Sequence, residues 1–288
     1  MKLPAPEGRA AILLAALLWS SGALFIKGAP LEGLEVVGGR AVVTVIFQLL
    51  VLRPDLRRAR WTSALPYAAM MVTYVTATKL TSAANAILLQ YSGTAWVLLL
   101  GPRLLGEPLA RRDLAVAGVC LLGMGLCLRD SPAPEAGLAE TAGTGNLLAL
   151  ASGVFYALTL LSMRRDSVEG TATASTTLGN LLAAGGALAL AKAPASAYFT
   201  PLALGALLWL GVVQIGIAYL LFQRGLRTVP AATAGLLVLL EPVLSPLWVW
   251  WGRGEAPGAW TVAGGALIVL ALGAREWASR PGAQAPAP

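Results

Sequence analysis

The sequence predicts an all-α integral membrane protein of ten transmembrane helices, arranged as two inverted repeats of five helices each. Three observations support this fold class. The 288 residues are 57% hydrophobic and 12% charged, whereas a soluble domain has about 25% charged residues. The apolar residues form long runs of about the 20 residues that cross a bilayer. Short motifs recur in the same order in the two halves of the chain.

The apolar runs divide into ten predicted spans that are separated by short polar loops. Ten spans of about 20 residues nearly fill the chain, which leaves no room for a separate catalytic domain. The first run continues as a full span without a small-residue cleavage site, so an uncleaved first helix is expected. The predicted spans cover residues 10–28, 34–52, 61–80, 83–101, 111–129, 144–163, 172–192, 201–222, 230–251 and 257–277.

The lysines and arginines are distributed unevenly between the two sides of these spans. One side holds fifteen of them and the other side holds five, with Arg40 inside a span. Cytoplasmic loops carry the excess of Lys and Arg, so both termini are expected in the cytoplasm. Abundant Ala and Gly, and Arg in preference to Lys, are typical of GC-rich bacteria, so the expected location is the bacterial inner membrane. The side with five is Lys27, Lys79, Arg129, Lys192 and Arg253.

The two halves of the chain are predicted to be repeats of opposite orientation. A polar segment between Arg129 and Gly145 separates them and is expected to be an external linker. Each half has five spans, an odd number, so the second half enters the membrane the opposite way. The expected domains are residues 9–129, residues 144–277 and a cytoplasmic tail of residues 278–288. The matching motifs are Thr81-Ser82-Ala83-Ala84 with Val229-Pro230-Ala231-Ala232, Gly106-Glu107 with Gly254-Glu255, and Val116-Ala117-Gly118 with Val262-Ala263-Gly264.

Among the acidic residues of the sequence, Glu241 is the only one that clearly lies at membrane depth within a predicted span. A charge at mid-membrane depth costs about 3 kcal/mol or more, so Glu241 is expected to face a cavity or a partner. The next residue, Pro242, has no N–H and opposes the carbonyl of Val238, which breaks the helix. Transporters build substrate sites from such broken helices near the midplane. The structural alternative is a kinked helix in which Glu241 is tied to a neighbouring helix.

Other polar and aromatic residues inside the spans are candidates for the same site. Amides and hydroxyls can hydrogen-bond an ammonium or a carboxylate, and Tyr and Trp rings offer stacking faces and cation–π attraction. Each aromatic could equally serve helix packing or a membrane-interface belt, which is the role expected of Trp248, Trp250, Trp251 and Trp260. Arg40 is expected to pair with Glu32, Glu35 or a carbonyl. The expected substrate-binding residues are Trp19, Tyr74, Thr78, Gln90, Tyr91, Ser92, Trp96, Tyr156, Gln214, Tyr219 and Glu241.

The order and spacing of these features, over about residues 9 to 277, resemble the drug/metabolite transporter superfamily with paired EamA repeats. Each half ends in an apolar run, Gly-Glu, a loop and a final helix, and the second half departs in having Ala256-Pro257 after its Gly-Glu. The resemblance implies a central cavity lined by spans 1, 3, 4, 6, 8 and 9. Further matching features are Arg40, Lys79-Leu80-Thr81-Ser82-Ala83 and Glu241-Pro242-Val243. A narrower resemblance, to YddG-type amino-acid exporters, rests on Leu18-Trp19-Ser20, Gly33-Leu34 and Val37-Gly38-Gly39.

The sequence therefore predicts a secondary transporter that exports small organic solutes by alternating access, with aromatic or neutral amino acids as the expected solutes. A multidrug or organic-cation exporter of the same fold is the alternative. An enzyme is not expected, because the chain has no histidine and offers no acid–base pair or metal cluster in its spans. The expected partners are a small-molecule substrate and the lipid bilayer, without nucleic acid, metal or cofactor, and a monomer is compatible with the sequence, which leaves the oligomeric state open.

Overall fold

The computed structural model describes residues 8–129, 140–253 and 258–278, and all regular structure in these ranges is helical. The Gly254-Glu255 and Ala256-Pro257 motifs, most of the expected external linker and all but the first residue of the expected tail lie outside the described residues. The first half contains α1 (Gly8–Ser20), α2 (Gly22–Gly28), α3 (Gly33–Phe47), the π-helix η1 (Gln48–Leu52), the 3₁₀ turn η2 (Leu56–Arg58), α4 (Trp61–Leu80), α5 (Ala83–Gln90), α6 (Gly93–Leu105) and α7 (Arg111–Arg129).

The second half repeats this layout. Within the described residues, every predicted span falls on a helical stretch, because long apolar runs leave the backbone no other way to satisfy its polar groups in lipid. Most ends agree within a few residues, but the helix that begins at Ala142 continues to Glu169, beyond the predicted end at residue 163. The elements of the second half are α8 (Ala142–Glu169), α9 (Ala172–Leu190), the 3₁₀ turn η3 (Ala195–Phe199), α10 (Pro201–Leu208), the π-helix η4 (Trp209–Ile217), α11 (Ala218–Leu226), α12 (Ala231–Leu237), α13 (Leu240–Arg253) and α14 (Ala259–Ala278).

Five helical stretches in the described part of the chain are long and apolar enough to cross a membrane. The remaining predicted spans are shorter or more polar. For example, α7 begins with three charged residues and α9 carries several hydroxyls and Asn180. The structure therefore supports a multi-pass membrane protein. The five qualifying stretches are Gly8–Gly28, Gly33–Leu52, Ala83–Leu105, Ala142–Glu169 and Pro201–Leu226.

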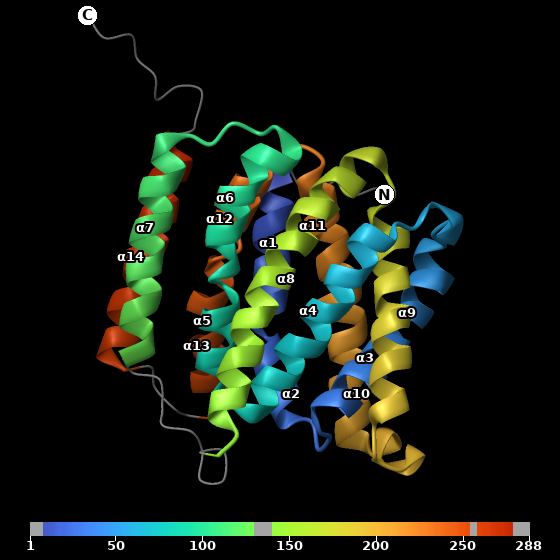
Figure 1. The fold of residues 1–288 in the computed structure, drawn as a ribbon. Coiled ribbons are helices and arrows are strands. Elements are labelled where there is room, and N and C mark those ends of the chain that lie inside the picture. Colours follow the sequence, from blue (N-terminus) through green and yellow to red (C-terminus); the bar gives the residue numbers. More distant parts are fainter. Residues whose placement is uncertain (1–7, 130–139, 254–257, 279–288) are drawn as a thin grey trace, which may run out of the picture.

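The helices lie side by side in one bundle, and the two halves are interleaved (Figure 1). The most extensive packing joins a helix of one half to a helix of the other, namely α4 to α8, α7 to α14, α3 to α9, α4 to α9 and α1 to α11. The pair α7–α14 forms one edge of the bundle, and α3, α9 and α10 lie toward the opposite edge (Figure 1). The centre of the bundle, where the site lies, is consequently built by both halves.

The spans at the centre are interrupted. In the α12–α13 span the helix stops at Val238 and Leu239, one turn before Pro242, and the carbonyl of Val238 accepts a 2.9 Å hydrogen bond from the N–H of Glu241. This confirms the predicted break and shows how the freed carbonyl is satisfied.

The α5–α6 span breaks at Tyr91 and Ser92 without any proline. The hydroxyl of Ser92 donates to the carbonyl of Leu89 at 2.6 Å, which competes with the helical pattern. Next to it, Gly93 packs so closely on α8 that an added Cβ would lie 2.2 Å from the carbonyl oxygen of Gly153. This break depends on tertiary packing, so the sequence analysis did not predict it.

Candidate functional site

A cavity of about 50 Å³ lies where the interrupted helices meet. Its walls come from α1, α3, α4, α5, α8, η4, α11 and α13. These elements belong to the six spans that the resemblance implied, together with the second span, α3. Both halves of the chain therefore contribute to one buried space near the middle of the bundle.

Glu241 and Tyr91 join the two helix breaks across this cavity. The hydroxyl of Tyr91 donates to Oε2 of Glu241 at 2.5 Å, and both side chains are buried. Glu241 lies in the first turn of α13, where the helix dipole favours a negative charge. The ring of Tyr91 also meets that of Tyr156 edge-on, at 5.5 Å between centroids. Glu241 therefore lines the cavity, as expected of a carboxylate at this depth, and is also tied to a neighbouring helix.

Arg40 is buried in the same cavity, and of its predicted partners it has a carbonyl, that of the Gln214 side chain, and neither Glu32 nor Glu35. Its guanidinium donates to Oε1 of Gln214 at 3.3 Å and approaches Sδ of Met71 at 3.1 Å. Glu35 instead accepts hydrogen bonds from the backbone N–H groups of Lys192 and Ala193. Among the described residues, no carboxylate forms an ion pair with Arg40. The sequence did contain a signal that Arg40 lines the cavity, because Arg40 is a lone charge in an apolar run. The same argument was applied to Glu241.

Aromatic side chains form much of the remaining wall. The ring of Trp19 lies 4.8 Å from that of Tyr219 and 4.9 Å from that of Phe222, measured between centroids. In the described residues, Trp19 Nε1, Tyr156 Oη and Thr159 Oγ1 are buried without a hydrogen-bond partner. Burying a polar group unpaired costs about 1–3 kcal/mol, so these three groups are available to a bound solute.

The structure brings eight of the eleven predicted site residues to this cavity and leaves three outside its wall. Thr78 donates its hydroxyl to the carbonyl of Tyr74, and Ser92 does so to that of Leu89. Trp96 is 45% exposed on the outer face of α6. It follows the Tyr91–Ser92 break, so it lies on a different face of the helix from the residues that point into the bundle. The eight residues at the cavity are Trp19, Tyr74, Gln90, Tyr91, Tyr156, Gln214, Tyr219 and Glu241.

The tryptophans at the end of α13 and the start of α14 are mostly exposed. Trp250, Trp251 and Trp260 are exposed, as an interface belt requires, and the guanidinium of Arg129 lies 4.3 Å from the ring of Trp260. Trp248 differs, because its Nε1 donates to Oγ of Ser20 at 2.7 Å and so links α13 to α1.

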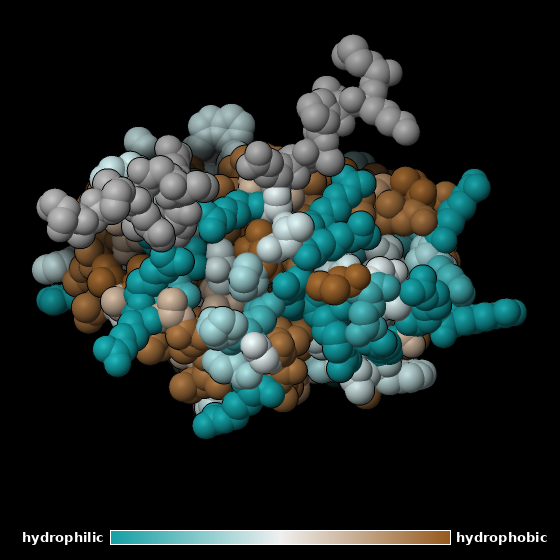
Figure 2. Space-filling view, turned by 90° about the horizontal axis from the view of Figure 1, so that it is seen from above, coloured by the Kyte–Doolittle hydropathy of each residue, from teal (hydrophilic) through white to brown (hydrophobic). Residues whose placement is uncertain are grey.

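One end of the bundle is rich in arginine, and we call it the arginine-rich end. It is the end at which α1, α4, α7, α9 and α12 begin, and Figure 2 shows hydrophilic side chains spread across it. Two ion-paired clusters connect the helix ends there. In one of them, Nε of Arg164 lies 2.7 Å from Oε1 of Glu107, while Oε2 of Glu107 accepts from the N–H of Ala231. The exposed arginines at this end are Arg9, Arg53, Arg57, Arg58, Arg103, Arg111, Arg112, Arg165, Arg224 and Arg227.

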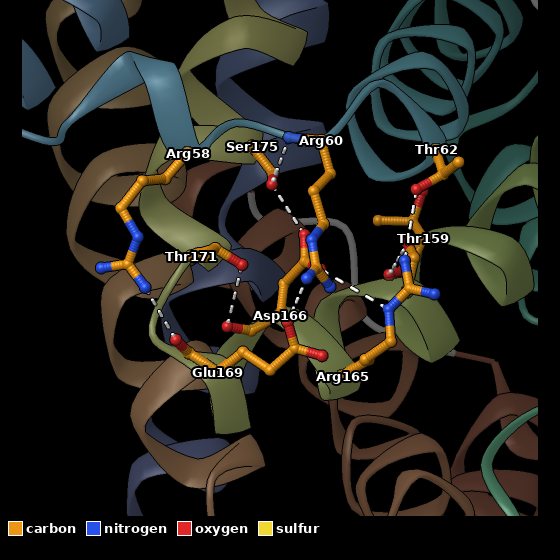
Figure 3. A network of polar contacts seen from close by, with 10 residues as sticks. Arg58, Arg60, Thr62, Thr159, Arg165, Asp166, Glu169, Thr171 and Ser175 are labelled. Carbon is orange, nitrogen blue, oxygen red and sulfur yellow. Dashed lines mark hydrogen bonds and ion pairs between the residues drawn. The ribbon is translucent and has the colours of Figure 1, made fainter.

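The second cluster at the arginine-rich end centres on Asp166 (Figure 3). Its carboxylate accepts from the hydroxyl of Ser175 at 2.7 Å and pairs with Arg60 at 3.3 Å. Arg60 also pairs with Glu169, and this hydrogen bond, with the two nearby carboxylate charges, raises the pKa of Arg60 above its ordinary value. The cluster joins the start of α4, the end of α8 and the start of α9.

Comparison with known proteins agrees with this architecture. An uncharacterized transporter of Archaeoglobus fulgidus is 27% identical over 272 residues, which cover 92% of this chain and 94% of that protein. A protein of known crystal structure superposes with a TM-score of 0.75 at 23% identity, over 95% of this chain and 97% of that one, which shows a shared fold. The model of the EamA-like transporter family matches the chain twice, over residues 7–129 and 143–273. The chain therefore belongs to the EamA-like transporter family of the drug/metabolite transporter superfamily.

Proposed function

We propose that this protein is a secondary transporter that exports neutral or aromatic amino acids across the bacterial inner membrane by alternating access. The observation that carries the proposal is that one cationic residue, Arg40, and one carboxylate, Glu241, both line the wall of one buried cavity. An amino-acid zwitterion has a carboxylate that suits a guanidinium and an ammonium that suits a carboxylate. The aromatic wall around Trp19 offers a surface for its side chain.

The same cavity argues against the alternative of an organic-cation exporter. A cation without a carboxylate would gain from Glu241 but would be repelled by Arg40, and it would leave that buried guanidinium without an anionic partner. Arg40 thus favours a solute with both charges. This distinction was not available from Glu241 and the aromatic residues alone.

The helix packing supports the proposed ten spans and inverted repeats, residues 9–129 and 144–277. The third helix of the first half packs on the first helix of the second half (α4 on α8), and the reciprocal pair is α1 on α11. The second helices pair with each other (α3 on α9), as do the fifth helices (α7 on α14). A two-fold axis in the membrane plane exchanges or preserves these pairs, which is the symmetry of inverted repeats.

The size of the cavity supports alternating access. Ligand sites measure about 300–1,000 Å³, whereas this cavity measures about 50 Å³. Polar contacts also link different helices at both ends of the bundle. Arg164 pairs with Glu107 at the arginine-rich end, and Nζ of Lys79 donates to the carbonyl of Ala29 at the other end. These features support a closed form in the proposed cycle, in which the cavity must widen toward one end to admit a solute. The helix breaks offer hinges for that change.

Transport assays of the purified protein in liposomes test this function. We expect uptake and counterflow of neutral and aromatic amino acids, and a loss of transport efficiency of roughly ten- to hundredfold in Arg40→Gln, because a charge-assisted hydrogen bond contributes about 1.5–3 kcal/mol. The transport efficiency of Arg40→Lys should lie between those of the wild type and Arg40→Gln, because lysine keeps the charge but not the planar geometry of the guanidinium.

Transport of organic cations but not amino acids, unaffected by Arg40→Gln, would support the alternative exporter and refute our proposal. Uptake without counterflow would indicate a channel in place of a carrier, because only a carrier exchanges labelled for unlabelled solute against a gradient.

A further inference from the structure

We propose that a membrane-lipid acyl chain binds in a second cavity, between α6 and α7. This cavity measures about 250 Å³ and lies apart from the central one, with no lining residue in common. Its wall is apolar apart from the hydroxyl of Thr94 and contains no ionisable side chain, so it suits a hydrocarbon and offers no charge to an ion or a zwitterion. Lining residues include Leu98 and Leu99 of α6, Leu121 and Met124 of α7, and Leu239.

The second cavity opens to the outside of the bundle. Three leucines in its wall are exposed on the outer surface: Leu99 by 56%, Leu114 by 50% and Leu121 by 43%. α6 belongs to a stretch that qualifies as a membrane span, and the hydrocarbon of the bilayer surrounds the outer surface of such a span. An unfilled apolar space forfeits the dispersion contacts of its lining. The acyl chains that already surround this face are therefore the occupants that the position favours.

Small residues create the cavity. On one side, α7 packs tightly on α14, where an added Cβ on Gly264 would lie 2.3 Å from the carbonyl oxygen of Gly123. On the side of α6, α7 presents Ala117 and Gly118, which are too short to fill the space. An added Cβ on Gly118 would meet nothing within 4 Å. The α7–α14 pair is thus held together at the edge of the bundle (Figure 1), and the gap toward α6 is left for another apolar group.

The cavity also touches both helix breaks that carry the Tyr91–Glu241 hydrogen bond. Leu239 lies in the α12–α13 break, two residues before Glu241, and Thr94 lies in the first turn of α6, directly after the other break. A bound acyl chain would support these two breaks from the side opposite the central cavity. This effect on transport depends on the proposed function, whereas the binding of the chain does not.

Photo-crosslinking tests the binding itself. The full chain is reconstituted in phosphatidylcholine vesicles that contain a lipid with a diazirine in its acyl chain, and the adducts are mapped by peptide mass spectrometry after irradiation. We expect adducts on residues 94–99 and 114–124. Absence of adducts on both segments in the wild type would overturn the proposal.

Two glycine variants separate this site from general contact with lipid. Gly118→Phe fills the cavity and should abolish the adducts on the cavity-lining residues Thr94, Ala95 and Leu98, whereas the exposed Leu99 stays open to surrounding lipid. Gly118→Leu serves in its place if the larger side chain prevents folding. Gly125→Phe is the matched control, because Gly125 lies seven residues further on α7, is equally open around its Cβ and does not line the cavity. Adducts on Thr94, Ala95 and Leu98 that persist in the filled variants at the wild-type level would refute the site.

The same vesicles distinguish a second copy of the chain as the occupant. Leu99→Cys and Leu121→Cys are placed in a chain whose native cysteines are replaced by alanine. Oxidation should leave both variants monomeric if lipid covers this face. Disulfide-linked dimers formed through both positions would show that another protein chain occupies the cavity, and would contradict our proposal.

Discussion

The carboxylate of Glu241 is held in the protein interior by one specific contact and one local effect. Tyr91 donates a 2.5 Å hydrogen bond to it, and the first turn of α13 places it where the helix dipole favours negative charge. The residue therefore has structural support whether or not it takes part in transport. A substitution must therefore separate the structural role of Glu241 from its role in transport.

At the residue scale, we expect Glu241 to couple transport to protons by exchanging a proton during the cycle, so Glu241→Gln should slow transport and flatten its pH dependence between about pH 5 and 8. The amide keeps the shape and can still accept from Tyr91, but it cannot exchange a proton. Proton-driven flux in liposomes across this pH range measures the effect.

Tyr91→Phe is the control for this prediction, because it removes the hydrogen bond but leaves the carboxylate. It should lower the rate and retain a pH-dependent profile. If Glu241→Gln keeps both the wild-type rate and the wild-type profile, Glu241 has no coupling role and acts only as a structural residue of the broken helix.

At the scale of single elements, the contact between α6 and α8 decides where the α5–α6 span breaks. Gly93 and Gly153 face each other at this crossing, and a Cβ on either would meet the backbone of the other span at 2.2 to 2.8 Å. Backbone atoms cannot move aside as the tip of a side chain can. The crossing positions Tyr91 next to Tyr156, so it sets the geometry of the site as well as the packing.

Gly93→Ala should therefore destabilise the protein by about 1–3 kcal/mol, the usual cost of overpacking. Gly101→Ala on the same helix is the matched control, because the nearest atom to its Cβ would be Leu161 Cδ2 at 3.7 Å, an ordinary contact. Thermal unfolding in detergent, followed by circular dichroism, compares the two. Equal melting temperatures would show that the crossing can relax at no cost.

The two central breaks also differ in how far the sequence predicts them. The α12–α13 break follows from Pro242, because a proline removes a helical N–H and opposes the carbonyl four residues earlier in any context. The α5–α6 break depends on Gly153 of another helix. The η4 π-helix around Gln214 likewise has no proline signal, although irregular helical turns of this kind often occur at functional sites.

At the scale of the whole molecule, the arginine-rich end is predicted to face the cytoplasm. A cysteine at Ala59, between η2 and α4, should be labelled only from inside, whereas one at Ala195, at the start of η3, should be labelled from outside. Membrane-impermeant maleimide on intact cells and on inverted vesicles measures this, in a chain whose buried Cys120 and Cys127 are replaced by alanine. External labelling at Ala59 would reverse the predicted orientation.

The sequence by itself determined the helical spans, the family and the Pro242 break. Each of these depends on local properties, namely apolar length, motif order and the covalent geometry of proline. Eight of the predicted site residues reach the central cavity, because polar and aromatic side chains at mid-membrane depth avoid lipid and point into the bundle. Only the tertiary structure decided that Trp96 faces outward and that Arg40 shares a cavity with Glu241. Which face of a helix points inward depends on its neighbours, and here helices far apart in the chain bring these two charges together.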